Sequence, residues 1–138
     1  MGERNPYDEV QYASLPRPQT HPDRLATVAR LFGMQPARID RCRVLELGCG
    51  DGSNLIPMAY SLLDSSFQGV DIAPLPLSRG RETIRRLGLK NITLECLDVM
   101  DAPAALGRFD YIIAHGLFSW VPPVVREHVF RICKTNLA

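Results

Sequence analysis

The hydrophobic pattern of the chain changes repeatedly between two periods. Short apolar runs predict strands, and they occur at 43–47, 67–71, 92–97 and 109–114. The last run is apolar at consecutive positions, which is typical of a strand buried on both faces. Between the runs, apolar residues recur at helical spacing. Because strands and helices alternate, the pattern predicts an α/β fold with a mainly parallel sheet and right-handed crossovers.

The ends of the helical segments carry capping signals. Thr20 opens a capping box, in which it accepts from the backbone three residues further on, and Gly33 stops that helix in a left-handed conformation. Asp51 or Ser53 caps the second helix. Helices are expected over 20–33, 55–63 and 74–87, the last ended by Gly88, and from the Pro122–Pro123 pair onward, with a helical turn at 102–106. The expected core-facing residues are Leu25, Val28, Ala29, Phe32, Leu55, Ile56, Met58, Ala59, Leu62, Leu63, Leu77, Ile84, Leu87, Val125, Val129, Ile132 and Cys133.

Composition narrows the class of protein. The 138 residues, of which 46% are apolar, allow one domain with one core. A net charge of +1 gives no bulk electrostatic signal for nucleic acid or an acidic membrane. No apolar stretch predicts a signal peptide or a spanning helix. The four cysteines are scattered and lack metal-ligand spacing, so we expect reduced thiols in a cytoplasmic protein and no metal site.

The stretch 44–52, VLELGCGDG, carries the most specific signal. A strand is followed by glycines at 48, 50 and 52 and then by a helix. Glycine permits positive φ and close approach of a ligand, and a helix N-terminus favours anions. The arrangement predicts a nucleotide-type site at the carboxyl edge of a parallel sheet. A dinucleotide fingerprint needs its third glycine at position 53, which is Ser53, so an NAD-dependent oxidoreductase is disfavoured.

Three successive predicted strands end in acids, namely Glu46, Asp71 and Asp98. In a parallel sheet these ends share one edge, so one ligand can contact all three. A carboxylate suits a ribose diol or the amino group of a base. Asp71 follows the glycines by the distance of about 20 residues that a ribose-binding acid requires. Any one of these acids is alternatively a helix cap, but their coincidence with the glycine loop favours a shared ligand.

The segments LELGCGDGSN, GVDIA, LDVMD and FDYIIAHGLFSWVP resemble, in order, the motifs of the class I S-adenosylmethionine-dependent methyltransferases. The resemblance extends from about Thr20 to the end of the chain. THPDRLA, VLELGCGDGSNLIPMA and FDYIIAHGLFSWV are also similar to bacterial methyltransferases that carry a regulatory domain after the catalytic one. The resemblance to class I methyltransferases implies a Rossmann-like parallel sheet of order 3-2-1-4 with helices on both faces. It also implies S-adenosylmethionine as cofactor.

The resemblance also implies roles for individual residues. The glycines lie close to the methionine and ribose, Glu46 positions the methionine amino group or braces the loop, Asp71 binds the ribose, and Asp98 binds the adenine amino group. The full implied cofactor-binding set is Glu46, Gly48, Cys49, Gly50, Gly52, Asp71, Ile72, Asp98, Val99 and His115. His115 is the candidate general base, or alternatively a backbone contact or packing residue. Trp120 either begins the substrate pocket or anchors the core.

The sequence departs from the family in its number of strands. Class I methyltransferases have seven, and the pattern here supplies four. We therefore expect an arm at 1–19, with Tyr7 and Tyr12 either packed on the body or capping the cofactor, and a domain at 20–138 that lacks strands five to seven. Strand four would then be an open edge that invites self-association.

The predicted function is methyl transfer to an unidentified acceptor, with cofactor binding expected to survive better than turnover. The alternative is a non-catalytic module that binds S-adenosylmethionine or S-adenosylhomocysteine and acts through a partner.

Overall fold

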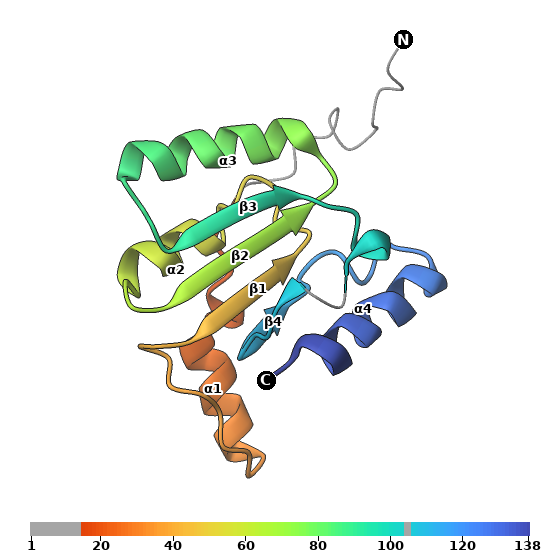
Figure 1. Ribbon diagram of the computed structural model, residues 1–138. Coiled ribbons are helices and arrows are strands. Elements are labelled where there is room, and N and C mark those ends of the chain that lie inside the picture. The colour runs from red at the N-terminus through yellow and green to blue at the C-terminus, as the bar shows by residue number, and fades with distance from the viewer. Residues whose placement is uncertain (1–14, 104–105) are drawn as a thin grey trace.

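The computed structural model describes residues 15–103 and 106–138 (Figure 1). Its centre is a parallel sheet of order β3-β2-β1-β4, as predicted. The strands are β1 (Arg43–Leu47), β2 (Ser66–Asp71), β3 (Ile92–Cys96) and β4 (Tyr111–Ile113). The helices are α1 (Pro22–Leu31), α2 (Leu55–Ser61), α3 (Pro74–Leu87) and α4 (Pro123–Asn136), with 3-10 turns η2 (Pro18–Thr20) and η3 (Val99–Asp101).

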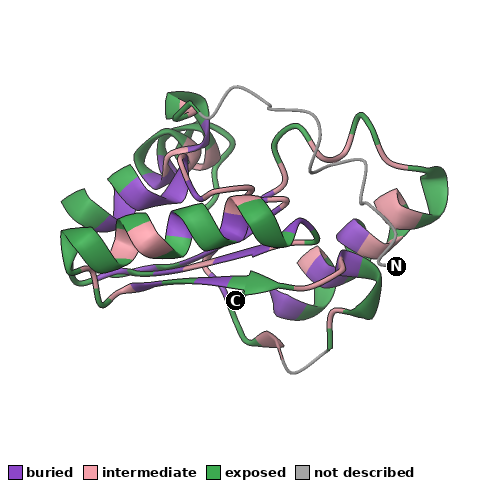
Figure 2. Cartoon of the chain, turned by 90° about the horizontal axis from the view of Figure 1, so that it is seen from above, coloured by how far each residue is buried: buried purple, intermediate pink, exposed green. Residues whose placement is uncertain are grey.

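Helices cover both faces of the sheet, which confirms the predicted layering (Figure 2). Residues of β1 alternate between the two sides, so Val44 joins the core under α1, α2 and α3, whereas Leu45 and Leu47 join the core under α4. Burial on both sides explains why this strand carries apolar residues on both faces, at Val44, Leu45 and Leu47. The first core contains Ala26, Leu55, Met58, Phe67, Leu77 and Leu94, and the second contains Val70, Val99, Phe109, Val129 and Ile132.

β4 is shorter than the predicted 109–114. It begins at Tyr111 because Asp110 turns its carboxylate onto the backbone N–H of Arg43, at 2.8 Å. Phe109 instead forms an isolated parallel bridge with Leu137. Among the described residues, β4 pairs as a strand with β1 alone. Self-association through this edge stays a prediction.

The start of α1 differs from the prediction. His21, not Thr20, is the N-cap, since its ring nitrogen Nδ1 accepts from the backbone N–H of Asp23 at 3.2 Å. Thr20 is buried and ends the preceding turn, where its hydroxyl donates to the carbonyl of Arg17 at 2.8 Å. A threonine suits either a capping box or a 3-10 turn. The bond that the Thr20 hydroxyl accepts from the distant Asn54 side chain favours the turn here.

The predicted inward face of α1 is wrong at two of its four residues, since Leu25 packs against the first core and Ala29 is half-buried, as expected. Val28 and Phe32 are 51% and 82% exposed, whereas Pro22 and Ala26 are buried. The buried positions are four residues apart and therefore share one helix face. Pro22 and Ala26 let α1 pack closely together with Leu25, while Val28 and Leu31 point outward.

Other predicted boundaries shift by a few residues. α2 ends at Ser61, and Leu63 beyond it is 69% exposed, so it is not a core residue. Leu87, at the end of α3, is also exposed, although α3 has its predicted bounds and ends at Gly88 with φ +66°. Residues 1–14 of the predicted arm 1–19, with Tyr7 and Tyr12, lie outside the described residues, as does part of the predicted turn at 102–106. The described end of the arm enters the η2 turn at Pro18. No helix in the described part of the chain is long and apolar enough to cross a membrane.

Candidate functional site

The order of the strands makes the carboxyl end of β1 the point where the strand order reverses direction. β2 pairs with one side of β1 and β4 pairs with the other, so the connections leave β1 in opposite directions. In open α/β sheets, ligands bind at such a reversal, outside the carboxyl ends of the strands. The glycine loop follows β1 directly at this point.

The three loop glycines have positive φ, as the sequence predicted. Their φ angles are +74° at Gly48, +56° at Gly50 and +75° at Gly52. A Cβ at Gly48 would meet the Leu117 side chain at 3.3 Å, and one at Gly52 would meet the Leu94 side chain at 3.0 Å. A Cβ at Gly50 would meet no atom within 4 Å. Gly50 therefore leaves the loop backbone open to a ligand, while the other two pack within the protein.

Two further glycines, missed by sequence reasoning as functional positions, seat this loop. A Cβ on Gly69 of β2 would lie 2.7 Å from the Cys49 sulfur, and one on Gly80 of α3 would overlap the carbonyl oxygen of Asp51. Gly69 thus leaves room for the Cys49 side chain, and Gly80 permits a close approach of the loop backbone to α3. The available signal was a glycine inside a strand and another inside a helix.

Cys49 packs beneath the loop as a buried thiol. Burial, followed by the nearby charges of Asp71 and Glu46, raises the pKa of this thiol. A thiol with a raised pKa is a poor nucleophile. Within the predicted cofactor-binding set, Cys49 therefore supports the loop by packing beneath it rather than by reacting.

Asp71, at the end of β2, braces the loop. Its Oδ2 accepts from the backbone N–H of Gly50 at 2.8 Å, and its Oδ1 accepts from that of Ala73 at 2.9 Å. Each carboxylate oxygen can accept more than one hydrogen bond, so Asp71 keeps capacity for a ligand.

Glu46 lies within β1 rather than beyond its end, and it is only 4% exposed. Its Oε1 accepts from the Asn54 side-chain amide at 2.9 Å, while its buried Oε2 has no hydrogen-bond partner among the described residues. Burial raises the pKa of Glu46 to about 7, with the charge of Asp71 adding to the rise and the bond from Asn54 opposing it. An unpartnered buried carboxylate oxygen costs free energy unless a donor reaches it. The site therefore fits a ligand that carries a cationic donor.

The remaining predicted residues lie after β2, β3 and β4. Ile72 is 45% exposed, and Val99 is buried. Asp98 caps η3, where its Oδ1 accepts from the backbone N–H of Met100 at 2.9 Å. This bond corresponds to the helix-cap role that the sequence left open as an alternative for this acid. His115 is exposed in the turn after β4.

Trp120 is 78% exposed, which excludes its alternative role as a core anchor. Within residues 15–103 and 106–138, no cluster of three or more histidine, cysteine or acidic residues is placed to hold a metal ion.

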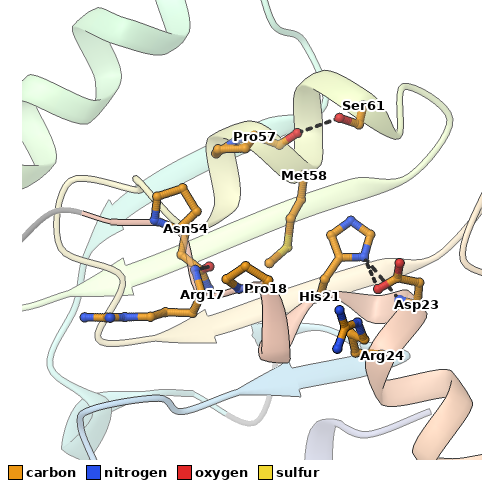
Figure 3. Close-up of a pocket in the computed structure, with 10 residues that line it drawn as sticks. Arg17, Pro18, His21, Asp23, Arg24, Asn54, Pro57, Met58 and Ser61 are labelled. Atoms are coloured by element: carbon orange, nitrogen blue, oxygen red, sulfur yellow. Dashed lines mark hydrogen bonds and ion pairs between the residues drawn. The ribbon is translucent and has the colours of Figure 1, made fainter.

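A hollow of about 290 Å³ lies on the α1 and α2 side of the loop (Figure 3). His21 and Asp23 pair across its rim, with Nδ1 and Oδ1 2.7 Å apart. Asn54, which sequence reasoning did not single out, lines the hollow beside Arg17. Asn54, at the N-cap of α2, therefore connects the hollow to the helix that follows the glycine loop.

Comparisons with known proteins agree with this geometry. A family model described as a methyltransferase domain matches residues 44–138. The protein RP789 of Rickettsia prowazekii is 42% identical over 138 residues, which are 100% of this chain and 25% of RP789. The structure of PKMT2 from Rickettsia typhi in complex with AdoHcy has a TM-score of 0.88 and 32% identity, covering 93% of this chain and 25% of PKMT2. The aklanonic acid methyltransferase DauC of Streptomyces sp. (strain C5) is 30% identical over 112 residues, covering 64% of this chain and 51% of DauC.

The chain spans about a quarter of the length of RP789 and of PKMT2. The similarity to the bacterial group with a regulatory domain stays a prediction. The family match runs from β1 to α4 and includes the glycine loop together with all three strand-end acids. The chain therefore belongs to the methyltransferase-domain family of the class I S-adenosylmethionine-dependent methyltransferases.

Proposed function

We propose that this chain binds S-adenosylmethionine and forms the cofactor-binding part of a methyltransferase. The observation that carries the proposal is the unpartnered Oε2 of Glu46 beneath a glycine loop that is open at Gly50. The methionine part of the cofactor carries an ammonium group, which is a donor of the kind that this oxygen lacks. Membership of the family, and the binding of AdoHcy by PKMT2, support the same ligand.

The strand ends suggest how the rest of the cofactor is held. Asp71 accepts from the ribose hydroxyls with the capacity left after its two backbone bonds. Ile72, which is exposed at the same edge, packs against the adenine. Asp98 accepts from the adenine amino group, near the backbone amide of Val99. The backbone N–H of Leu97 donates to the carbonyl of Asp71 at 2.9 Å, which supports the assignment by joining the ends of β2 and β3.

Methyl transfer requires the protein mainly to align the acceptor with the methyl group. S-adenosylmethionine supplies a methyl group on a positively charged sulfur, which is already a good leaving group. A lone pair of the acceptor forms the new bond to the methyl carbon, the carbon–sulfur bond breaks, and its electron pair stays on sulfur. Holding the two reactants in line supplies a large part of the rate enhancement. His115, exposed after β4, is the candidate to take a proton from the acceptor.

The cysteines support a location for this activity. Cys42, Cys49, Cys96 and Cys133 are all free thiols. Free thiols suit a reducing compartment, so we place the protein in the cytoplasm.

Isothermal titration calorimetry with S-adenosylmethionine, AdoHcy and NAD tests the proposal. We expect the first two to bind and NAD not to bind. Binding of NAD alone would overturn the assignment. A panel of protein, small-molecule and lipid acceptors then separates the two roles, because transfer of a labelled methyl group identifies an enzyme. Cofactor binding without transfer to any acceptor favours a binding module that acts through a partner.

A further inference from the structure

One buried amide joins the turn before α1 to the strand that carries Glu46. The Oδ1 of Asn54 accepts from the backbone N–H of Arg17 at 2.7 Å. Its Nδ2 donates to the Thr20 hydroxyl oxygen at 2.9 Å and to Glu46 Oε1 at 2.9 Å. Asn54, Thr20 and Glu46 are all buried. Figure 3 shows Asn54 and Arg17 side by side at the hollow.

The surrounding groups fix the orientation of this amide. The backbone N–H of Arg17 only donates, so the oxygen of Asn54 must face it, and the nitrogen must face the other two partners. The Thr20 hydroxyl donates its own proton to the carbonyl of Arg17, and it therefore accepts from Asn54. Only one oxygen of Glu46 is engaged by this arrangement, and Oε2 is left for another donor.

The Asn54 side chain does not cap α2, the helix that follows it. Asn54 occupies the N-cap position of α2, where an asparagine side chain usually accepts from the first turn, yet it makes no such bond. Its side-chain hydrogen bonds among the described residues instead go to Arg17, Thr20 and Glu46. A capping role therefore does not explain why an amide is buried here.

We propose that Asn54 is a positioning residue for the amino-acid part of the cofactor. It orients Glu46 so that Oε2 receives the ammonium group, and it holds the turn at 17–20 against the glycine loop. This inference rests on the proposed function, since it assumes that S-adenosylmethionine or its product occupies the site.

The charges around Glu46 give the proposal a measurable signature. Burial and the charge of Asp71 raise the pKa of Glu46, and the bond from Asn54 lowers it. Cys49 also interacts with Glu46, and Arg17 belongs to the turn that Asn54 holds. Without Asn54, Glu46 would stay protonated to higher pH. A neutral carboxyl attracts an ammonium group less than a carboxylate does, so ligand binding would need a higher pH.

Calorimetry with two ligands tests this inference. AdoHcy carries the amino-acid part, and 5′-methylthioadenosine lacks it. Between about pH 5 and about pH 8, we expect Asn54→Ala to weaken AdoHcy about tenfold near pH 7 and to move the acid limb of its binding up by about one pH unit. The affinity for 5′-methylthioadenosine should stay within about twofold of that of the unchanged protein, because this ligand has no ammonium group to contact Glu46.

Asn54→Asp provides a second variant in case the alanine variant does not fold. It keeps the side-chain shape and the acceptor for Arg17, but it turns an acceptor toward Glu46, so the acid limb should move in the same direction. Asn91→Ala is the matched control. The Asn91 amide donates to the carbonyls of Ala59, Leu62 and Ser65, and its loss should lower stability without moving the acid limb.

Equal weakening of both ligands, or a pH profile parallel to that of the unchanged protein, would overturn the role of Asn54. An unchanged protein that binds neither ligand would overturn the proposed function itself, and this inference with it. The two failures are therefore distinguishable.

Discussion

Replacing Glu46 by glutamine should change how the stability of this protein depends on pH. Burial raises the pKa of Glu46 from 4.5 to about 7 in the folded chain. The folded state therefore binds a proton that the unfolded state releases between these values, so the contribution of Glu46 to stability is fully present below pH 4.5 and is lost as pH rises through about 7. At about 1.4 kcal/mol per pKa unit, this loss amounts to about 3 kcal/mol.

The glutamine side chain stays neutral at every pH, so this loss disappears in the variant. Its oxygen still accepts from Asn54, but its amide nitrogen replaces the unpartnered Oε2 and brings a constant cost of roughly 1–3 kcal/mol. We therefore expect Glu46→Gln to be less stable than the unchanged protein at about pH 5 and as stable or more stable at about pH 8.

Urea unfolding at a series of pH values, followed by circular dichroism, measures the effect without ligand. The difference in unfolding free energy between the two proteins should change by about 3 kcal/mol across this range. Glu82→Gln on α3 is the matched control. Arg85 and Arg86 lower the pKa of Glu82 to about 2, so its titration lies outside the window. Parallel pH profiles for Glu46→Gln and the unchanged protein would refute the assignment of a raised pKa to this group.

Three further outcomes follow from the site geometry. Asp71→Ala should weaken S-adenosylmethionine binding by roughly 1–3 kcal/mol in calorimetry, because hydrogen bonds to a carboxylate are lost, and an unchanged affinity would mean that the ribose lies elsewhere. Gly80→Ala should lower the unfolding free energy by about 1–3 kcal/mol in urea, since its methyl group overlaps a loop carbonyl, and unaltered stability would contradict that close approach. Thiol labelling followed by mass spectrometry should modify exposed Cys96 well before buried Cys49, whose pKa is raised by burial, and the reverse order would argue against the packing of the loop.

The sequence predicted those features that depend on local pattern. Hydrophobic period separates strands from helices because side chains alternate across a strand and repeat every turn of a helix. α3 has its predicted bounds, and Gly33 and Gly88 have the positive φ expected of helix stops. The glycines at 48, 50 and 52 likewise have the expected conformation, because a residue type without Cβ reports directly on backbone geometry. The resemblance added the order of the strands, which no local pattern contains.

Contacts between distant segments could not be predicted in this way. The pattern of α1 identified its apolar residues but only part of its buried face, because several faces of a short helix satisfy the same period. Phe32 is accordingly exposed, while Ala26 is buried. The close approach of Gly80 to the glycine loop depends on how α3 is laid over the sheet, and the residues beside a glycine give no sign of that distance.

Glu46 shows which properties the sequence determined and which depended on the tertiary structure. The sequence by itself determined that a carboxylate sits beside a glycine loop at the carboxyl end of a strand. Only the tertiary structure decided that Asn54 satisfies one oxygen of Glu46 and leaves the other buried, without a partner among the described residues. The physical reason is that a pKa and an unsatisfied hydrogen bond depend on the complete surroundings of a group, and those surroundings come from segments that meet only when the chain folds.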